Sequence, residues 1–374
     1  MRILIVGAGL SGCSLARLLQ DRGHGVSLIE KEDHIGGLCI TRIGNYDLKF
    51  EPFGGRTFHT SHQRIIDFVT RFDPFNGYTH RKGMIIHDRL FPFPITREAI
   101  GDFEEQDAIF KELQARPKVM DKTNFETACL SIFGPTLYQY FVANYTAKMW
   151  GTDPRNLTAE WAPKRLEFRQ DDREGLFAGQ WQGLPDAGYS VFLERMIDGI
   201  SVELGRTAYA PADWDVVVNS APIDQVLDYR YGRLQYRSML FEYEYDQEWE
   251  RADYGTINLP QDPRWIRKCN FKVLHKQNTG HNIIQYQEPI AADEQNVPMY
   301  PINTLENNRV FDQYLKDICG TKNICPIGRL GLFKYLDMDK AVEVAFDMVD
   351  VVENYLTFNA DQRYSRISHI RQSY

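Results

Sequence analysis

Three glycines and one acid near the start of the chain are the residues whose types and spacing most clearly point to chemistry. Gly7, Gly9 and Gly12 follow the apolar run 3–6, and Glu30 ends a second apolar run. In a strand–turn–helix, such glycines make a tight turn, admit a pyrophosphate close to the backbone and let the helix pack on the strand. The helix N-terminus favours phosphate, and an acid at this remove binds a ribose hydroxyl. The pattern predicts a βαβ unit that binds a dinucleotide.

A second glycine pair decides which dinucleotide is favoured. Gly36 and Gly37 follow Glu30 and Lys31 after a short charged stretch. A glycine turn there brings backbone amides to the phosphates and ribityl region of a flavin dinucleotide, as in FAD proteins such as amine oxidases, although glycine pairs also mark ordinary turns. FAD is therefore preferred to NAD as the cofactor.

Composition limits the other possibilities. The chain has 374 residues, a net charge of −8 and interspersed charges of both signs, so it has no basic stripe for nucleic acid. Its six cysteines lack disulfide or metal spacing and are expected to be reduced, and no metal is predicted. No apolar run reaches transmembrane length and no signal-peptide cleavage site is seen, so a soluble, cytoplasmic protein without membrane insertion is expected.

The order of periodic segments predicts an α/β protein in which an FAD-binding Rossmann-like domain carries an inserted helical domain and an antiparallel β-sheet domain. Residues 1–78, 195–235 and 310–374 are assigned to the FAD-binding domain. Residues 79–170 are assigned to a mainly helical substrate domain with a mobile loop at 166–182, because residues 97–150 show helical spacing and 169–180 show little periodicity. The antiparallel sheet domain is assigned to 183–194 and 236–309.

With these segments placed, the chain resembles the UDP-galactopyranose mutase family along its whole length. The carrying motifs, in order, are GAGLSG, IEKEDHIGG, FGGRTFHT, NYTAKMWG, PKRLEF, WQGLPDAGYS, APIDQVLDYRYGRLQYRS, MYPIN and GRLGLFKYLDMD. The resemblance implies an isomerase that interconverts pyranose and furanose forms of a nucleotide-diphosphate sugar. In that family N5 of reduced FAD attacks the anomeric carbon and UDP departs and returns. It also implies an external flavin reductant and a homodimer.

The resemblance assigns catalytic roles to four residues. Arg165 in PKRLEF and Arg267 in WIRKC match two arginines that meet the departing pyrophosphate, which suits bidentate guanidinium chemistry. Arg264 and Lys268 are close enough to leave the second assignment open. Tyr335 in YLD matches a tyrosine that contacts the diphosphate. His59 in FHT matches a histidine near flavin and substrate, although a lone histidine is as often structural.

Substrate and cofactor residues follow from the same motifs. Phe141 and Tyr145 recur on one helical face before Trp150, which suits a core stripe or the uridine and sugar pocket; the family motif favours the pocket. Phe177 and Tyr300 complete the expected substrate set. The expected cofactor residues, beyond the glycines Gly7, Gly9, Gly12, Gly36 and Gly37, are Glu30, Lys31, Arg56, Val218, Arg329, Asp337 and Met338.

Two departures from the family weaken the assignment of the substrate. Arg56 stands where the family usually has a histidine and adds fixed charge beside the isoalloxazine. Leu176, before Phe177, replaces a tyrosine, so one pyrophosphate or sugar contact is lost and a nucleotide sugar other than UDP-galactose becomes an alternative. Two further alternatives are an amine-oxidase-like flavin oxidoreductase and a nucleotide-binding module without chemistry.

Overall fold

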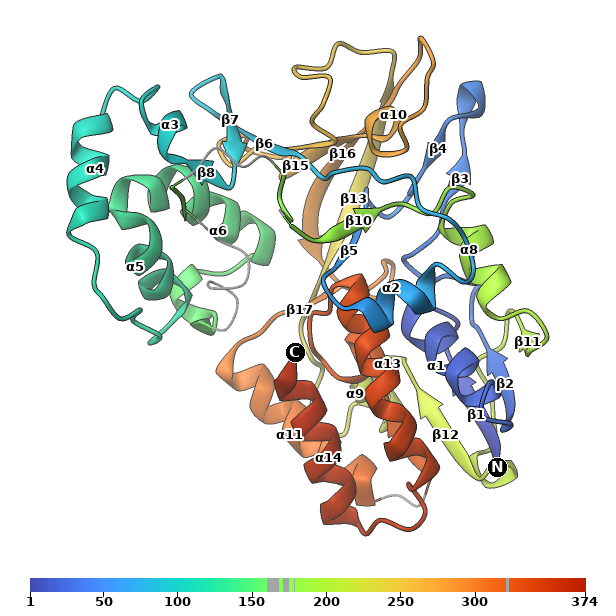
Figure 1. The fold of residues 1–374 in the computed structure, drawn as a ribbon. Coiled ribbons are helices and arrows are strands. Elements are labelled where there is room, and N and C mark those ends of the chain that lie inside the picture. The colour runs from blue at the N-terminus through green and yellow to red at the C-terminus, as the bar shows by residue number, and fades with distance from the viewer. Residues whose placement is uncertain (160–167, 171–174, 178, 321–322) are drawn as a thin grey trace.

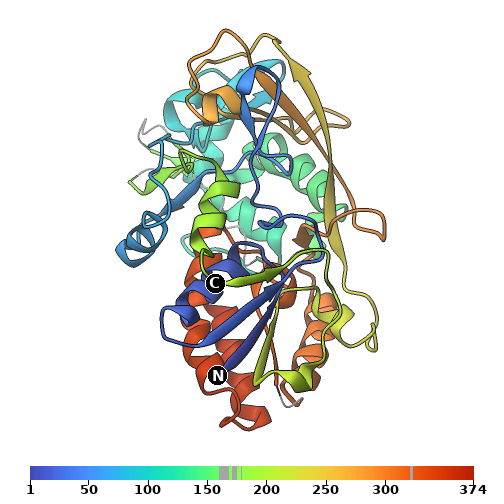
Figure 2. The ribbon, with the colours of Figure 1, turned by 90° about the vertical axis from the view of Figure 1, so that its right-hand side faces the viewer.

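A parallel sheet assembled from distant parts of the chain forms one end of the molecule (Figures 1 and 2). The computed structural model describes residues 1–159, 168–170, 175–177, 179–320 and 323–374. All neighbouring strands of this sheet are parallel. The strand order is β11 (Ser201–Glu203), β2 (Gly25–Ile29), β1 (Arg2–Val6), β12 (Val216–Asn219) and β18 (Ile324–Pro326). This confirms a Rossmann-like unit built from both ends of the chain.

Helices from both ends of the chain pack around this sheet. Helix α1 (Leu10–Gln20) lies against α13 (Met338–Glu353) and α8 (Tyr189–Met196). Helix α14 (Ala360–Ser373) contacts α13 and α11 (Leu305–Gly320). Buried aliphatic residues of β1, α1 and α13 belong to one apolar core, so burial rather than local helix propensity holds the termini together. The short helices α9 (Ile223–Val226) and α12 (Gly328–Gly331) follow β12 and β18.

A second, larger sheet forms the other half of the molecule (Figure 1). Its strand order is β17 (Tyr300–Pro301), β13 (Tyr236–Tyr245), β16 (Ile283–Ala291), β15 (Arg267–Asn270), β14 (Thr256–Asn258), β6 (Lys82–Ile86) and β7 (Arg89–Phe93). The long pairing of β13 with β16 is antiparallel, which confirms the alternating patterns of these segments. Only the pairing of β14 with β6 is parallel.

The strands β6 and β7 correct the sequence-based assignment of residues 82–93 to the helical domain. His87 and Asp88 both have positive φ, near 48° and 58°, and join the two strands as a tight hairpin. Such a turn matches the twist of paired strands, so this segment joins the sheet. Residues 189–194, assigned to the sheet domain, likewise lie in helix α8. The division into three domains otherwise stays a prediction.

The helical part occupies residues 97–156, as its periodicity predicted for 97–150. Its elements are α3 (Arg97–Ile100), α4 (Gln106–Gln114), α5 (Phe125–Tyr138), η2 (Gln139–Ala143), α6 (Asn144–Trp150) and η3 (Pro154–Asn156). Together with residues of the large sheet, they form a second apolar core. Helix α6 ends at Gly151, whose φ of 63° is the left-handed conformation that closes many helices.

Short elements connect these layers. They are β3 (Arg42–Ile43), η1 (Asn45–Asp47), β4 (Lys49–Phe50), β5 (Phe58–Thr60), α2 (Gln63–Val69), β8 (Ile95–Thr96), β9 (Phe168–Arg169), β10 (Trp181–Gly183), η5 (Pro211–Asp213) and α10 (Phe271–Leu274). In the segment expected to be a mobile loop, 168–169 and 181–182 are strand residues, while 166–167, 171–174 and 178 lie outside the described residues. Among the described helices, none is both long and apolar enough to cross a membrane.

Candidate active site

The glycine turn between β1 and α1 has the geometry that its sequence predicts. A Cβ on Gly7 would lie 2.1 Å from Ser220 Oγ, and one on Gly12 would lie 2.1 Å from the Gly7 carbonyl oxygen. A Cβ on Gly9 would meet no protein atom closer than 3.9 Å, because Gly9 faces a cavity. Gly7 and Gly12 are therefore needed for packing, whereas Gly9 leaves room for a ligand.

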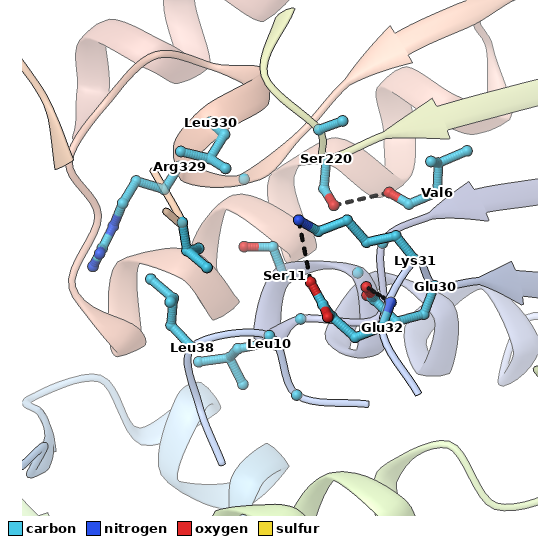
Figure 3. Close-up of a pocket in the computed structure, with 18 of the residues that line it drawn as sticks. Val6, Leu10, Ser11, Glu30, Lys31, Glu32, Leu38, Ser220, Arg329 and Leu330 are labelled. Atoms are coloured by element: carbon cyan, nitrogen blue, oxygen red, sulfur yellow. Dashed lines mark hydrogen bonds and ion pairs between the residues drawn. The ribbon is translucent and has the colours of Figure 1, made fainter. Parts of the chain in front are cut away.

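Glu30 lies at the end of β2 beside this turn (Figure 3). Its carboxylate accepts hydrogen bonds from the backbone N–H of Ala8 at 2.7 Å and of Glu32 at 3.1 Å. The side chain of Lys31 pairs with Glu32 at 3.2 Å. The second glycine turn is joined to the first, because the Gly36 N–H donates to the Ala8 carbonyl at 2.8 Å. These contacts fix an acid and two glycine turns around one space.

That space is a cavity of about 600 Å³. Of the expected cofactor residues, Gly7, Gly9, Gly12, Glu30, Lys31, Gly36, Gly37, Arg56, Arg329 and Met338 line it. Val218 does not line it: the residue is fully buried on β12, between β1 and β18 of the parallel sheet. Asp337 is absent from the lining and lies at the N-cap position of α13, without a side-chain capping hydrogen bond to the described residues. The open face of Gly9, the buried carboxylate and the two arginines suit an extended anionic dinucleotide.

Sequence reasoning missed several lining residues, including Arg206, Tyr209, Ser220 and Gln225. A signal for Ser220 was present, because it directly follows the buried strand β12 and ligands bind beyond the carboxyl ends of parallel strands. Arg206 and Tyr209 lie in an irregular connection after β11. Nothing in the sequence pattern of that connection indicated a ligand.

Arg56 and Arg329 bring positive charge to the same part of the cavity. Both arginines line the cavity together with Cys39. Burial raises the pKa of the Cys39 thiol, and the positive charges of Arg56 and Arg329 oppose that shift. Arg56 donates to the Gly54 carbonyl at 2.8 Å. Arg329 donates to the carbonyls of Met299 at 3.1 Å and Leu336 at 2.7 Å. Because neither guanidinium forms an ion pair with a carboxylate among the described residues, both positive charges are available to an anionic ligand.

Aromatic rings lead from Arg329 toward the helical part. The rings of Tyr300 and Tyr335 stack 5.8 Å apart at an interplanar angle of 11°. The Arg329 guanidinium lies 4.5 Å from the Tyr335 ring centre and 5.3 Å from that of Tyr300. Trp150, at the end of α6, meets Tyr300 edge-on at 6.4 Å. Tyr300 and Tyr335 therefore contact Arg329, which lines the cavity, and Trp150 joins them through Tyr300.

Arg267 joins this group through Tyr145. Its Nη2 donates to the Tyr145 hydroxyl at 2.7 Å, while its buried Nε has no hydrogen-bond partner among the described residues. Burial raises the pKa of Tyr145, although Arg267 opposes the shift, so the hydroxyl accepts as a neutral group. The neighbouring cations point elsewhere: Arg264 pairs with Glu242 and Glu288, and Lys268 pairs with Glu250. This distinguishes Arg267 from the two alternatives left open by sequence.

Phe141 is not brought to this group. It is 1% exposed and packs edge-on against Phe91 at 6.3 Å and Phe103 at 6.1 Å, inside the helical core. The structure thus places Phe141 in the core stripe that was its alternative interpretation. Arg165 lies outside the described residues.

His59 lies on β5, held from two sides. Its Nδ1 is 2.9 Å from Gln180 Oε1, and its ring stacks on Phe177 with centres 3.4 Å apart. One ligand atom each of His59, Asp337 and Asp339 lies within 4.8 Å of the others. Burial raises the pKa of Asp339, and the nearby imidazole partly offsets this. Phe177 therefore lies against His59, which is close to Asp337 and Asp339. Leu176, the preceding residue, donates its backbone N–H to the His80 carbonyl at 2.7 Å.

Comparison with known proteins decides the family. A sequence profile described as UDP-galactopyranose mutase matches residues 140–335, more than half of the chain. A probable UDP-galactopyranose mutase from Klebsiella pneumoniae is 31% identical over 366 residues, covering 93% of this chain and 94% of the relative. The chain belongs to the UDP-galactopyranose mutase family. It is therefore a flavin-dependent pyranose–furanose mutase of nucleotide sugars.

Other similarities agree with this membership. A dTDP-fucopyranose mutase from Escherichia coli is 27% identical over 370 residues, covering 92% of this chain and 97% of the relative. A solved structure of reduced UDP-galactopyranose mutase shares the fold, with a TM-score of 0.79, 16% identity and coverage of 99% of this chain and 98% of that one. A profile of NAD(P)-binding Rossmann-like domains matches residues 5–72. A putative L-amino-acid oxidase from Bacillus subtilis matches only 40% of the chain, so the oxidase alternative is a distant likeness.

Proposed function

We propose that this family member uses reduced FAD and acts on UDP-galactose or a closely related nucleotide hexose. The observation that carries the proposal is that Arg329 belongs both to the cavity beside the glycine turns and to the group formed by Tyr300 and Tyr335. Arg329 lines the cavity below the glycine turns, and its guanidinium lies against the Tyr300–Tyr335 pair. A cofactor in the cavity and a sugar nucleotide beside the tyrosines would therefore be neighbours.

FAD would be held by residues that already face the cavity. Glu30 would bind a ribose hydroxyl, Gly9 would admit the pyrophosphate, and Met338 would pack at the cavity wall. When bound, reduced FAD supplies a nucleophilic nitrogen for the anomeric carbon of the sugar. Arg56 and Arg329 would favour the electron-rich state of the flavin, because fixed positive charge stabilises a nearby anion.

The leaving diphosphate would be met by Arg267, with Tyr335 and Tyr300 as hydroxyl donors. Cations and donors aimed at developing charge in a dry site stabilise it more than water does. Arg165 is proposed for the same charge on the family resemblance alone. Tyr145, Trp150 and Phe177 would border the nucleoside and sugar. His59, in contact with Phe177 and close to Asp339, would lie between this pocket and the start of α13.

Product analysis with reduced enzyme tests the proposal. Protein purified with FAD is reduced with dithionite and incubated with UDP-galactopyranose or dTDP-fucopyranose, and pyranose is separated from furanose. We expect furanose to form catalytically with reduced enzyme only, without consumption of reductant. Equal conversion by oxidised enzyme would contradict the role of reduced FAD. Stoichiometric oxygen consumption with an oxidised product would instead favour the oxidase alternative, and FAD binding without either product would favour a binding module.

Leu176 bears on which sugar nucleotide is preferred. A tyrosine hydroxyl lost from the pocket removes a hydrogen bond to a charged group, worth about 1.5–3 kcal/mol. We therefore expect weak affinity for UDP-galactose and a gain from Leu176→Tyr, measured as KM. A wild-type enzyme that prefers UDP-galactose, with no gain in the variant, would show that another residue compensates.

The cellular setting is proposed on chemical grounds. All six cysteines are unpaired and buried, which suits a reducing compartment such as the cytoplasm. A flavin that must be reduced requires an external reductant. The homodimer implied by the family resemblance is tested by light scattering of the FAD-loaded protein.

A further inference from the structure

Lys148 connects the helical part to the strand that carries Arg267. It lies on α6, three residues after Tyr145. Its ammonium donates to the backbone carbonyls of Leu259 at 2.8 Å and Trp265 at 2.7 Å, and also to that of Asp262. An ammonium group has three donors, so the loop 259–265 satisfies all of them.

Two contacts therefore join α6 to the beginning of β15. Trp265 precedes Arg267 by two residues, and Arg267 itself donates to Tyr145. On a helix, residues three apart lie on the same face. Lys148 and Tyr145 thus contact the same short segment, one turn apart. Within the described part of the chain Arg267 Nε has no hydrogen-bond partner. The guanidinium is therefore oriented by its contact with Tyr145 and by the placement of β15 between β14 and β16.

Arg237 fixes the other side of the same helix end. This arginine on β13 donates from Nε to the Met149 carbonyl at 3.0 Å, and from Nη2 to the carbonyls of Lys148 at 3.3 Å and Pro289 at 3.0 Å. The C-terminal end of α6 is thereby tied to the large sheet. Movement of α6 relative to the large sheet would break contacts of both Lys148 and Arg237.

Partial burial of the Lys148 ammonium disfavours its charge. Burial lowers the pKa of Lys148, although Asp262 partly opposes the shift. A group with a lowered pKa in the folded state destabilises that state while it is protonated. An apolar side chain would avoid this desolvation. The three carbonyl contacts oppose this desolvation cost, and they are the interactions that the side chain makes with the loop 259–265.

We propose that Lys148 is a positioning residue that holds the Arg267 guanidinium in place for the diphosphate of the substrate. The inference rests on the proposed function of Arg267. Lys148 itself touches neither the cofactor cavity nor the tyrosine pair. Its effect reaches the diphosphate only through the loop 259–265 and β15.

A double-mutant cycle on diphosphate binding tests the inference. Binding of UDP and dTDP to the FAD-loaded protein is measured by calorimetry for wild type, Lys148→Met, Arg267→Ala and the double variant. We expect each single variant to bind about tenfold more weakly and the double variant to bind no more weakly than Arg267→Ala, since coupled residues are not additive. Lys148→Arg should recover part of the loss. Lys111→Met, which removes an exposed lysine on α4, is the matched control and should bind as wild type.

The outcomes separate the two proposals. Additive losses, or normal binding by Lys148→Met, would overturn the positioning role while leaving Arg267 as a diphosphate ligand. Normal binding by Arg267→Ala would overturn the proposed function of Arg267 and the positioning role with it. If Lys148→Met fails to retain FAD or to unfold cooperatively, Lys148→Gln, whose shorter side chain has two N–H donors in place of three, takes its place in the cycle. A smaller loss of binding is then expected, again not additive with Arg267→Ala.

Discussion

Gly9 and Gly12 lie three residues apart in one turn, yet the structure predicts opposite consequences for adding a methyl group to each. A Cβ on Gly12 would lie 2.1 Å from the Gly7 carbonyl oxygen and 3.4 Å from Ile5 Cγ2. Helix α1 would have to shift away from β1, although it also packs against α13 and α8. Overpacking of this kind costs about 1–3 kcal/mol, so Gly12→Ala should lower the free energy of unfolding by that amount even without cofactor.

Gly9→Ala should act on the cofactor instead. Gly9 has a φ of −75°, which alanine adopts readily, and its Cβ would meet no protein atom within 3.9 Å. The methyl group would enter the cavity where the dinucleotide is proposed to bind. A clash of about 1–3 kcal/mol with the ligand corresponds to roughly 5- to 150-fold weaker FAD binding. The apoprotein should keep its stability within about 0.5 kcal/mol.

Urea unfolding of the apoproteins and titration with FAD separate the two effects. Gly280→Ala, at a position with nothing within 4 Å of its Cβ, is the control for both measurements and should match wild type. Two results would refute the reasoning: a destabilised Gly9→Ala apoprotein, or a Gly9→Ala protein that binds FAD as tightly as wild type. The first would mean that Gly9 packs against protein, and the second that the ligand lies elsewhere.

Three further predictions concern single side chains. Tyr145→Phe removes the hydrogen-bond acceptor of Arg267, so KM for the sugar nucleotide should rise about tenfold or more. An unchanged KM would contradict a role of this hydrogen bond in substrate binding. Arg329→Met should weaken FAD binding about tenfold or more, because a positive charge is lost at the cavity wall. Arg309→Met, at an exposed site on α11, is the control and should bind FAD as wild type. Equal FAD affinity of the two variants would contradict the charge argument. Burial lowers the pKa of His80 to about 3 from an ordinary 6.5, so between these values the unfolded state binds more protons and stability falls as pH falls. His80→Gln should make the free energy of unfolding, measured with urea, less dependent on pH in this range. The same pH dependence in variant and wild type would mean that other groups cause the loss of stability.

The cofactor half of the site could be predicted from the sequence because its parts are close along the chain. Gly7, Gly9, Gly12 and Glu30 belong to one strand–turn–helix–strand unit, whose local geometry requires glycine at fixed positions. The structure confirms that all four line one cavity. Val218 shows the limit of the same reasoning. A strand residue that faces the cavity and one that is buried in the sheet have the same apolar sequence pattern, and the structure buries Val218.

The substrate half depended on family resemblance and on packing between distant segments. Helical spacing put Phe141 and Tyr145 on one face, but the structure buries Phe141 against Phe91 and Phe103 and turns Tyr145 to Arg267. Periodicity gives the face of a helix and not its neighbours. Residues 82–93 likewise became strands of the large sheet through pairing with a segment more than 150 residues away.

The sequence by itself therefore determined the glycine turns, the acid that ends the second strand and the family to which the chain is similar, since these reside in short contiguous motifs. Only the tertiary structure decided that Arg267 rather than Arg264 or Lys268 meets Tyr145, that Arg329 adjoins the stacked tyrosines, and that Lys148 holds the loop before Arg267. Each of these contacts joins elements far apart in the chain. Their geometry arises from burial and packing of whole layers, which no local pattern encodes.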